Sequence, residues 1–197
     1  MLKVALTGGI ATGKSEVLER LRRRGVACLD ADVLAHGVMA PGTEATAAIA
    51  GRFGADVLDA NGRVDRRVLG PIVFGDPLAR RELEAMVHPA VYRAIAAGLR
   101  ALELTEHPPL AVVDVPLLYE TGHHADFNKV IATVCPREMQ VARLAARGLD
   151  AVAVEQRLAA QMSAEEKARR ADFVIDTSGS FEHTDEQLDA ILAALTS

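Results

Sequence analysis

The residues from Gly8 to Ser15 have the types and spacing that bind phosphate groups. They fit the pattern Gly-x-x-x-x-Gly-Lys-Ser and directly follow the apolar run of residues 2–6. Glycines let the backbone curl so that successive N–H groups point at phosphate oxygens, and a helix that begins there adds the positive end of its dipole. The lysine supplies a point charge to the outer phosphates, and the serine offers a hydroxyl to Mg²⁺, which prefers oxygen ligands. The pattern therefore predicts a site for a nucleoside triphosphate.

The sequence around the loop distinguishes this interpretation from a glycine-rich turn that binds nothing. A buried strand is expected over residues 3–7 and a helix over residues 14–24, with Gly25 as the helix stop. A phosphate-binding loop needs this strand–loop–helix context. A switch GTPase is disfavoured, because Ile131 in "NKVI" stands where a guanine-reading element has aspartate. The residues expected to contact the nucleotide are Gly8, Gly9, Ile10, Ala11, Thr12, Gly13, Lys14, Ser15 and Glu16.

Strand-length apolar runs alternate with helical segments along much of the chain. Runs rich in valine and isoleucine are typical of parallel strands that are covered on both faces. This alternation predicts an α/β layered domain. The further strands are expected at residues 26–29, 110–115, 129–134 and 173–176.

One long stretch departs from the alternation. The residues between Leu29 and Leu110 are expected to be mostly helical, with Asp76 and Pro77 at the start of one helix. A turn is expected at residues 59–63, because Asn-Gly tolerates positive φ. We interpret the stretch as a helical insertion attached to the sheet.

A second departure covers residues 136–172, which are helical in pattern and rich in arginine. The capping-box spacing of Ser163 and Glu166 predicts that a new helix begins there.

The composition limits the class of protein. The 197 residues suit one domain with a small insertion, and the net charge of −5 argues against a broad nucleic-acid-binding surface. Cys28 and Cys135 lie in apolar segments, which favours buried reduced thiols over a disulfide framework or a zinc site. No apolar stretch reaches membrane-spanning length, and the first expected strand leaves no room for a signal peptide. We therefore expect a cytoplasmic protein that binds neither nucleic acid nor membranes.

Together with the phosphate-binding loop, five further motifs resemble those of the dephospho-CoA kinase family, in the same order, and the resemblance covers nearly the whole chain. The phosphate-binding loop is followed by "CLDADVLAH" at residues 28–36. The later motifs are "VFGDPLARRELEAMVHP" (73–89), "VVDVPLLYETG" (112–122), "QVARLAARG" (140–148) and "QMSAEEKARRADFVIDTSG" (161–179). The resemblance implies that ATP, with Mg²⁺, phosphorylates the ribose 3′-hydroxyl of dephospho-CoA to give CoA and ADP. It also implies a P-loop kinase core, with a five-stranded parallel sheet flanked by helices.

The resemblance implies a single domain over residues 1–197. Its core is expected to comprise residues 1–36, 107–135 and 171–197, the acceptor-binding helical insertion residues 37–106, and the lid residues 136–170. Two other functions stay open. One is another small-molecule or nucleotide kinase on the same core. The other is a nucleotide-binding regulatory module without transferase activity, against which the presence of Asp32 and of an acceptor-sized insertion weighs.

Asp32 is the predicted catalytic base. It follows the second expected strand, at the sheet edge where α/β proteins bind ligands. Its carboxylate can accept a hydrogen bond from the attacking hydroxyl and take its proton late in the transfer. The alternative is that Asp32 caps the next helix. The resemblance favours the base, and Asp30 is expected to be a supporting residue or a cap.

The resemblance implies that Lys14 and Arg143 stabilise charge on the transferring phosphoryl group. Arg143 and Arg147 lie four residues apart, on one face of an expected helix, and are predicted to contact the nucleotide. A solvated basic face is the alternative, and for Arg147 it stays fully open. Ser15 and Asp114 are the predicted Mg²⁺ ligands. For Asp114 the alternative is a buried acid that accepts hydrogen bonds from the loop backbone.

The predicted acceptor contacts besides Asp32 lie in two motifs. Leu117, Leu118 and Glu120 belong to an element that resembles the family's "PLLFE", with tyrosine at position 119 in place of phenylalanine. His88 belongs to a His-Pro element, and its alternative role is to start a helix or to pack in the interior.

Several residues depart from the family pattern. Tyr92 stands where an arginine commonly follows the His-Pro element, and Thr177 stands where asparagine is more usual. The threonine is still expected to form hydrogen bonds near the adenine. Ala11 replaces a glycine, so its backbone is expected to avoid positive φ. The remaining cations of the arginine-rich stretch are expected to be mostly solvated, and they are Arg157, Lys167, Arg169 and Arg170.

Overall fold

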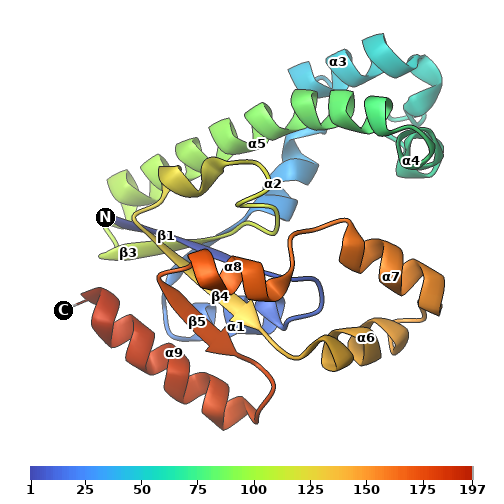
Figure 1. Cartoon of the computed structure of the whole chain (residues 1–197). Helices are drawn as coiled ribbons and strands as arrows, with labels where there is room; N and C mark the ends of the chain where they lie inside the picture. The colour runs from blue at the N-terminus through green and yellow to red at the C-terminus, as the bar shows by residue number, and fades with distance from the viewer. Residues whose placement is uncertain (197) are drawn as a thin grey trace. The chain divides into compact units, whose positions relative to one another are not determined.

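The computed structural model describes residues 1–196, which fall into two compact units (Figure 1). The first unit comprises Met1–Leu29 and the chain from Leu99 onward, and the second comprises Asp30–Gly98. The first unit contains the sheet, whereas helices form the second. The finer division into core, insertion and lid stays a prediction.

A five-stranded sheet forms the centre of the first unit. Its strands are β1 (Leu2–Gly8), β2 (Ala27–Asp30), β3 (Leu110–Asp114), β4 (Lys129–Val134) and β5 (Phe173–Asp176). They lie in the order β2-β3-β1-β4-β5. The prediction of a five-stranded parallel sheet flanked by helices is confirmed. β4 and β5 have the expected bounds, and the ends of β1, β2 and β3 differ from the expected ones by at most one residue.

The central position of β1 determines what surrounds the loop that follows it. β1 pairs in parallel with β3 on one side and with β4 on the other. In this register Leu6 lies opposite Asp114, and Gly8 lies opposite Thr133. All of β3 and the last five residues of β1 are buried, as expected for strands covered on both faces.

Two helices, α1 (Lys14–Arg23) and α9 (Phe181–Thr196), pack together on the sheet around the main hydrophobic core. Their buried apolar residues recur every three or four positions, which is the spacing of one helix face. Figure 1 shows α9 alongside β5. The core residues contributed by the two helices are Val17, Leu18, Leu21, Leu188 and Ile191.

Three further helices of the first unit follow β4. They are α6 (Arg137–Ala145), α7 (Ala151–Ala159) and α8 (Ala164–Arg170), and a 3₁₀ helix, η2 (His123–Asp126), precedes β4. α8 contacts β1 and β4. The backbone N–H of Glu166 donates to Ser163 Oγ at 3.1 Å, which confirms the helix start predicted there.

The second unit is helical, as expected. Its elements are α2 (Ala31–Val38), α3 (Glu44–Phe53), the 3₁₀ helix η1 (Ala55–Val57), α4 (Arg66–Gly75) and α5 (Pro77–Thr105), of which the part from Leu99 belongs to the first unit. They enclose a hydrophobic core of their own. The buried residues of this core are Ile49, Val57, Leu69, Val73 and Ala79.

Aspartates set the start of α5 and the predicted turn of this unit. The Asp76 side chain accepts the Leu78 N–H at 2.7 Å, so α5 begins at Pro77 as predicted. Asp59 accepts the N–H groups of Asn61 and Arg63, at 2.8 and 2.9 Å, and thereby closes the predicted turn.

The two cysteines are unpaired, as expected. Burial is the main cause that raises the pKa of the Cys28 thiol, to about 11, so this thiol stays protonated at neutral pH. Among residues 1–196, no helix combines the length and the apolar character needed to cross a membrane.

The contact between α1 and α9 makes a pH-dependent contribution to stability. Asp185 accepts hydrogen bonds from Arg20 and from Arg24, the latter at 2.7 Å. These hydrogen bonds hold the pKa of the Asp185 carboxyl below its usual value of 3.8. Because the folded state binds this proton less tightly than the unfolded state, the stabilisation is complete above 3.8 and is lost as the pH falls through the folded pKa.

We expect Asp185→Asn to lower Tm at pH 7, and the difference from the wild type to shrink below about pH 4. Thermal unfolding followed by circular dichroism across this pH range measures both. Glu186→Gln, on the same helix with a side chain that is 78% exposed, is the control and should change Tm little at any pH. A Tm difference for Asp185→Asn that is the same at neutral and acid pH would contradict the assignment.

Candidate functional site

The glycines of the phosphate-binding loop stand where a side chain does not fit. A Cβ atom on Gly8 would lie 2.1 Å from Thr133 Oγ1, and one on Gly9 would lie 2.9 Å from Ala164 Cβ. Gly13 has a φ of 82° and is the N-cap of α1. The loop is therefore pressed against β4 and the start of α8, and it enters α1 through a left-handed residue that favours glycine.

The expectation that Ala11 avoids positive φ is wrong. Its φ is 60°, in the left-handed region that costs a residue with a Cβ about 1–2 kcal/mol. The surrounding packing compensates for this cost. The Ala11 side chain is buried beside Leu144 and Val154, and its carbonyl oxygen accepts a hydrogen bond from Arg143 Nη1 at 3.0 Å.

Hydroxyl groups tie the loop to the ends of two strands. Thr12 Oγ1 lies 2.7 Å from the carbonyl oxygen of Gly9 and 2.7 Å from Thr133 Oγ1. Thr177, which follows β5, donates its hydroxyl to the carbonyl oxygen of Thr12 at 2.7 Å. Both threonines are buried. Thr177 thus acts on the backbone of the loop, a role that its place in the sequence did not predict.

Lys14 and Asp114 form an ion pair at the N-terminus of α1. Their side chains are only 14% and 6% exposed. Ser15 follows Lys14 and is exposed, and the neighbouring Glu16 pairs with Arg20 Nε at 2.9 Å. The structure therefore brings Lys14 and Asp114 together and leaves the Ser15 side chain at the surface.

Arg143 is anchored to the loop. Its Nη1 donates to Ala11, and its Nη2 donates to the carbonyl oxygen of Thr177 at 2.9 Å. Arg147 does not share its helix, because α6 ends at Ala145 and Arg147 lies in the turn that follows. Both arginines nevertheless line the same cavity of about 520 Å³.

This cavity adjoins the start of α1 and the segment that leads into α9. Its walls combine the two arginines with the acidic side chains of Glu16 and Glu182 and the ring of Phe181, which is 62% exposed. A volume of this size accommodates a nucleoside. The loop residues that line it are Ala11 and Gly13, and Thr177 lies beside them.

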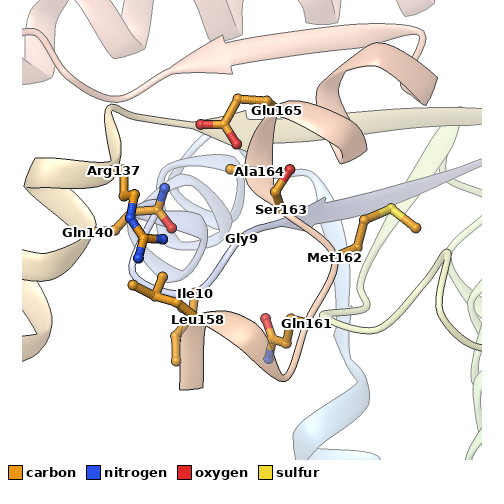
Figure 2. A pocket seen from close by; sticks show the side chains of 10 residues that line it. All are labelled: Gly9, Ile10, Arg137, Gln140, Leu158, Gln161, Met162, Ser163, Ala164 and Glu165. Atoms are coloured by element: carbon orange, nitrogen blue, oxygen red, sulfur yellow. The ribbon is translucent and has the colours of Figure 1, made fainter. Parts of the chain in front are cut away.

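A smaller cavity of about 70 Å³ lies on another side of the loop (Figure 2). Figure 2 shows Gly9 and Ile10 between the side chains of Arg137 and Gln140 on α6 and the start of α8. The volume suits a few water molecules rather than a nucleotide. Arg137 itself pairs with Glu155 at 2.5 Å. Ile10 and Gly9 thus face a space distinct from the larger cavity.

Lys167 is the residue of this region that the sequence interpretation missed. The charge run to which it belongs was expected to be solvated, and Arg157, Arg169 and Arg170 are exposed, but Lys167 is fully buried. Its Nζ lies 2.5 Å from the carbonyl oxygen of Pro116, 3.5 Å from that of Gly8 and 2.9 Å from Glu120 Oε1.

The buried ammonium of Lys167 therefore links α8 to the first glycine of the loop and to the segment after β3. Burial is the main cause that lowers the pKa of Lys167, and the hydrogen bond to Glu120 opposes it. No sequence pattern distinguished Lys167 from the solvated cations beside it, because only the fold determines which face of α8 meets the sheet.

The expected acceptor residues after β3 are partly enclosed. Leu118 is fully buried, and the Glu120 carboxylate accepts from Lys167 and from the backbone N–H of Met162 at 2.9 Å. The Tyr119 hydroxyl is buried and has no hydrogen-bond partner among the described residues, so no contact there requires tyrosine rather than phenylalanine. Leu117 is half-buried.

Of the two aspartates after β2, Asp30 caps the next helix and Asp32 does not. Asp30 is the N-cap of α2, and its Oδ1 accepts the N–H groups of Asp32 and Val33 at 2.8 and 3.2 Å. The idea that Asp32 caps this helix is wrong. Asp32 is exposed in the first turn of α2, and its carboxylate forms no hydrogen bond with the residues described.

His88 lies inside α5, half-buried, so the alternative that it starts a helix is also wrong. Pro89 is accommodated within the same helix. Over residues 1–196, no group of three or more His, Cys, Asp or Glu side chains is arranged to hold a metal ion.

The sequence profile of the dephospho-CoA kinase family matches residues 2–183. A dephospho-CoA kinase of Anaeromyxobacter dehalogenans is 47% identical over 196 residues, which cover 99% of this chain and 92% of that protein. A dephospho-CoA kinase of Leifsonia xyli is 43% identical, with 99% of each chain covered.

Solved structures agree with these relatives. A crystal structure of a Thermus thermophilus protein superposes with a TM-score of 0.83 at 37% identity and covers 100% of this chain and 98% of that one. The dephospho-CoA kinase of Campylobacter jejuni gives 0.74 at 28% identity, with 98% and 96% covered. A shikimate kinase of Acinetobacter baumannii, at 0.51 and 17% identity, with 100% and 94% covered, shares the fold.

We expect Lys167→Met to lower the free energy of unfolding by about 2–4 kcal/mol, because it leaves Glu120 and two carbonyl oxygens without their buried cation. Urea denaturation measures this loss. Arg169→Met is the matched control on the same helix, with a side chain that is 71% exposed, and should change stability by less than about 0.5 kcal/mol. Equal effects of the two substitutions would show that Lys167 stabilises nothing specific.

Proposed function

The chain belongs to the dephospho-CoA kinase family, and from this premise we propose that it transfers the terminal phosphoryl group of ATP to the ribose 3′-hydroxyl of dephospho-CoA. The products are CoA and ADP, and the reaction is the last step of CoA synthesis. The observation that carries the proposal is the phosphate-binding loop, in which Gly8, Gly13 and Lys14 stand on a backbone fixed by buried hydroxyl groups and by Arg143.

The bound nucleotide would lie along the loop and in the 520 Å³ cavity beside it. The N–H groups at the start of α1 would receive the phosphates. The nucleoside would occupy the cavity, where Arg143, Arg147 and Thr177 form part of the wall. Because Thr177 Oγ1 donates to the loop backbone, this residue would contribute to nucleotide binding mainly by shaping the loop.

Lys14 and Arg143 would stabilise the charge that develops on the transferring group. Both side chains are held by oxygen atoms of the protein: Lys14 by Asp114, and Arg143 by two carbonyl oxygens. Phosphate oxygens offer each cation a more strongly charged partner. A cation already positioned beside the site needs little reorganisation to serve in the transition state.

The residues present fit Mg²⁺. Ser15 offers an exposed hydroxyl in the first turn of α1, and Asp114 offers a carboxylate that Lys14 keeps near the same turn. Mg²⁺ usually keeps several water molecules and takes only one or two ligands from the protein. The ion would neutralise the charge of the phosphates, and Ser15 and Asp114 would hold it, Asp114 through water if Lys14 keeps its ion pair.

Asp32 would act as the base. Its carboxylate is exposed and free of the capping role that Asp30 performs. It would accept a hydrogen bond from the 3′-hydroxyl and take its proton as the oxygen attacks the terminal phosphorus. The bond to the bridging oxygen breaks, and ADP leaves with that oxygen.

The helical unit would provide acceptor contacts from His88, and the segment after β3 would provide them from Leu117 and Glu120. Leu118 would act through packing, since its side chain is fully enclosed. The arginine-rich helices between β4 and β5 would form the lid. Two unpaired cysteines are compatible with the reducing cytoplasm, where we propose that the protein works.

A coupled assay of ADP release tests the proposal. ADP formation should depend on dephospho-CoA, and mass spectrometry should identify CoA as the product. Turnover with a nucleoside monophosphate or a small alcohol, but not with dephospho-CoA, would indicate another kinase. Tight ATP binding with no acceptor-dependent turnover would indicate a regulatory module.

We expect Asp32→Asn to reduce kcat by about 10²–10⁴-fold, because the amide cannot take the proton of the 3′-hydroxyl. Calorimetry should show unchanged ATP affinity. Asp56→Asn, another exposed acid of the helical unit, is the matched control and should retain kcat. Full activity of Asp32→Asn would refute its assignment as the base.

Removal of divalent cations by EDTA should abolish turnover, because the phosphate charges are then no longer neutralised. Added Mg²⁺ should restore turnover. Ser15→Ala should raise the Mg²⁺ concentration needed for half-maximal activity, and added Mg²⁺ should largely rescue this variant. A Mg²⁺ requirement that is identical in the variant and the wild type would exclude Ser15 as a ligand.

A further inference from the structure

A cavity in the helical unit has cationic side chains around it. It measures about 330 Å³, and all of its lining residues lie within Asp30–Gly98. Its walls come from the last turn of α2, the turn after that helix and the segment that leads into α4. The side chains that matter for its chemistry are His36, Met39, Arg63, Val64 and Arg66.

The positive charge at this cavity is not neutralised by the acids nearest to it in the chain. Arg63 and Arg66 are exposed and form no ion pair with the residues that the structure describes. Asp65 caps α4 and pairs with Arg67 at 3.2 Å, and Asp59 closes its own turn. Two unpaired guanidinium groups at a concave surface favour an anion with several oxygen atoms, such as a diphosphate.

The position of the cavity along α2 relates it to the proposed base. His36 lies four residues after Asp32, so the two side chains lie on one face of α2, about 6 Å apart along the axis. In a nucleotide, the 3′-hydroxyl and the 5′-phosphate are separated by a few covalent bonds, a comparable distance. An adenosine whose 3′-hydroxyl meets Asp32 can therefore place its 5′-phosphates beside His36.

We propose that this cavity binds the 5′-diphosphate of dephospho-CoA. Arg63 and Arg66 donate hydrogen bonds to its oxygens, and His36 lies beside the phosphate nearer the ribose. Met39 and Val64 provide apolar walls where the pantetheine arm leaves the diphosphate. This inference rests on the proposed function, and it assigns the part of the acceptor that the helical unit recognises.

The diphosphate then serves as the group by which the acceptor is positioned. Binding energy from a part of the substrate that does not react can hold the 3′-hydroxyl against the base. Adenosine, which has the same hydroxyl but lacks the diphosphate, should be a poor acceptor. Substitutions at the cavity should weaken the use of dephospho-CoA and leave the use of ATP unchanged.

Steady-state kinetics of Arg63→Gln/Arg66→Gln test the proposal. We expect the KM for dephospho-CoA to rise about 10- to 100-fold and the KM for ATP to stay within about twofold of the wild type. Arg67→Gln is the matched control, since Arg67 is adjacent, pairs with Asp65 and does not line the cavity. It should leave both constants unchanged.

The outcomes separate this inference from the proposed function. No formation of CoA by the wild type refutes the function itself. If the wild type forms CoA and the double variant keeps its KM for dephospho-CoA, only the diphosphate site is refuted. With adenosine as acceptor, the wild type and the double variant should be equally poor, and a further loss in the variant would show that the arginines act elsewhere.

Circular dichroism verifies the fold of the double variant, and the wild type provides a second test. Because the proposed contacts are exposed ion pairs, the wild-type KM for dephospho-CoA should rise with ionic strength, and more steeply than that of the double variant. If the double variant does not fold, the salt dependence of the wild type tests the proposal alone. A wild-type KM for dephospho-CoA that does not change with ionic strength overturns the proposal.

Discussion

The phosphate-binding loop packs so closely against the elements on either side of it that this packing fixes the geometry of the site. Gly8 has no space for a Cβ atom beside Thr133, and Gly9 has none beside Ala164. The loop can approach β4 and α8 only because these positions are glycine. Hydrogen bonds from the hydroxyl groups of Thr12 and Thr177 then fix the backbone of the loop. The packing, rather than the intrinsic preference of each residue, decides its shape, as the positive φ of Ala11 shows.

Three cations of this unit are held around the loop by oxygen atoms of the protein. Lys14 pairs with Asp114, and Arg143 donates to carbonyl oxygens of the loop and of Thr177. Lys167 donates to the carbonyl oxygens of Gly8 and Pro116. The three cations differ in how deeply they are buried. Lys167 is fully buried, whereas Lys14 and Arg143 are only partly buried. Our proposal assigns to these two cations an exchange of protein oxygens for phosphate oxygens.

In the helical unit, the short helix α2 carries two of the groups on which our proposals depend. Asp30 takes the capping role at the start of α2, which leaves the carboxylate of Asp32 free one residue into the helix. One turn later, His36 borders a cavity with two unpaired arginines. The proposed base and the cationic pocket thus follow each other along one helix face, which is the order that our proposal requires for a nucleotide with a reactive hydroxyl and a charged tail.

Local patterns in the sequence were enough to predict several parts of this protein. Alternating strands and helices predicted the parallel sheet, and the spacing of glycines, lysine and serine located the phosphate-binding loop, because both depend on residues close together in the chain. Only the tertiary structure decided that Lys167 is buried while Arg169 is exposed, that Arg147 lies beyond its helix, and that Thr177 holds the loop. The contacts of Lys167 and Thr177 join segments that are far apart in the chain, such as Thr12 and Thr177, and no local spacing encodes which faces the fold will bring together.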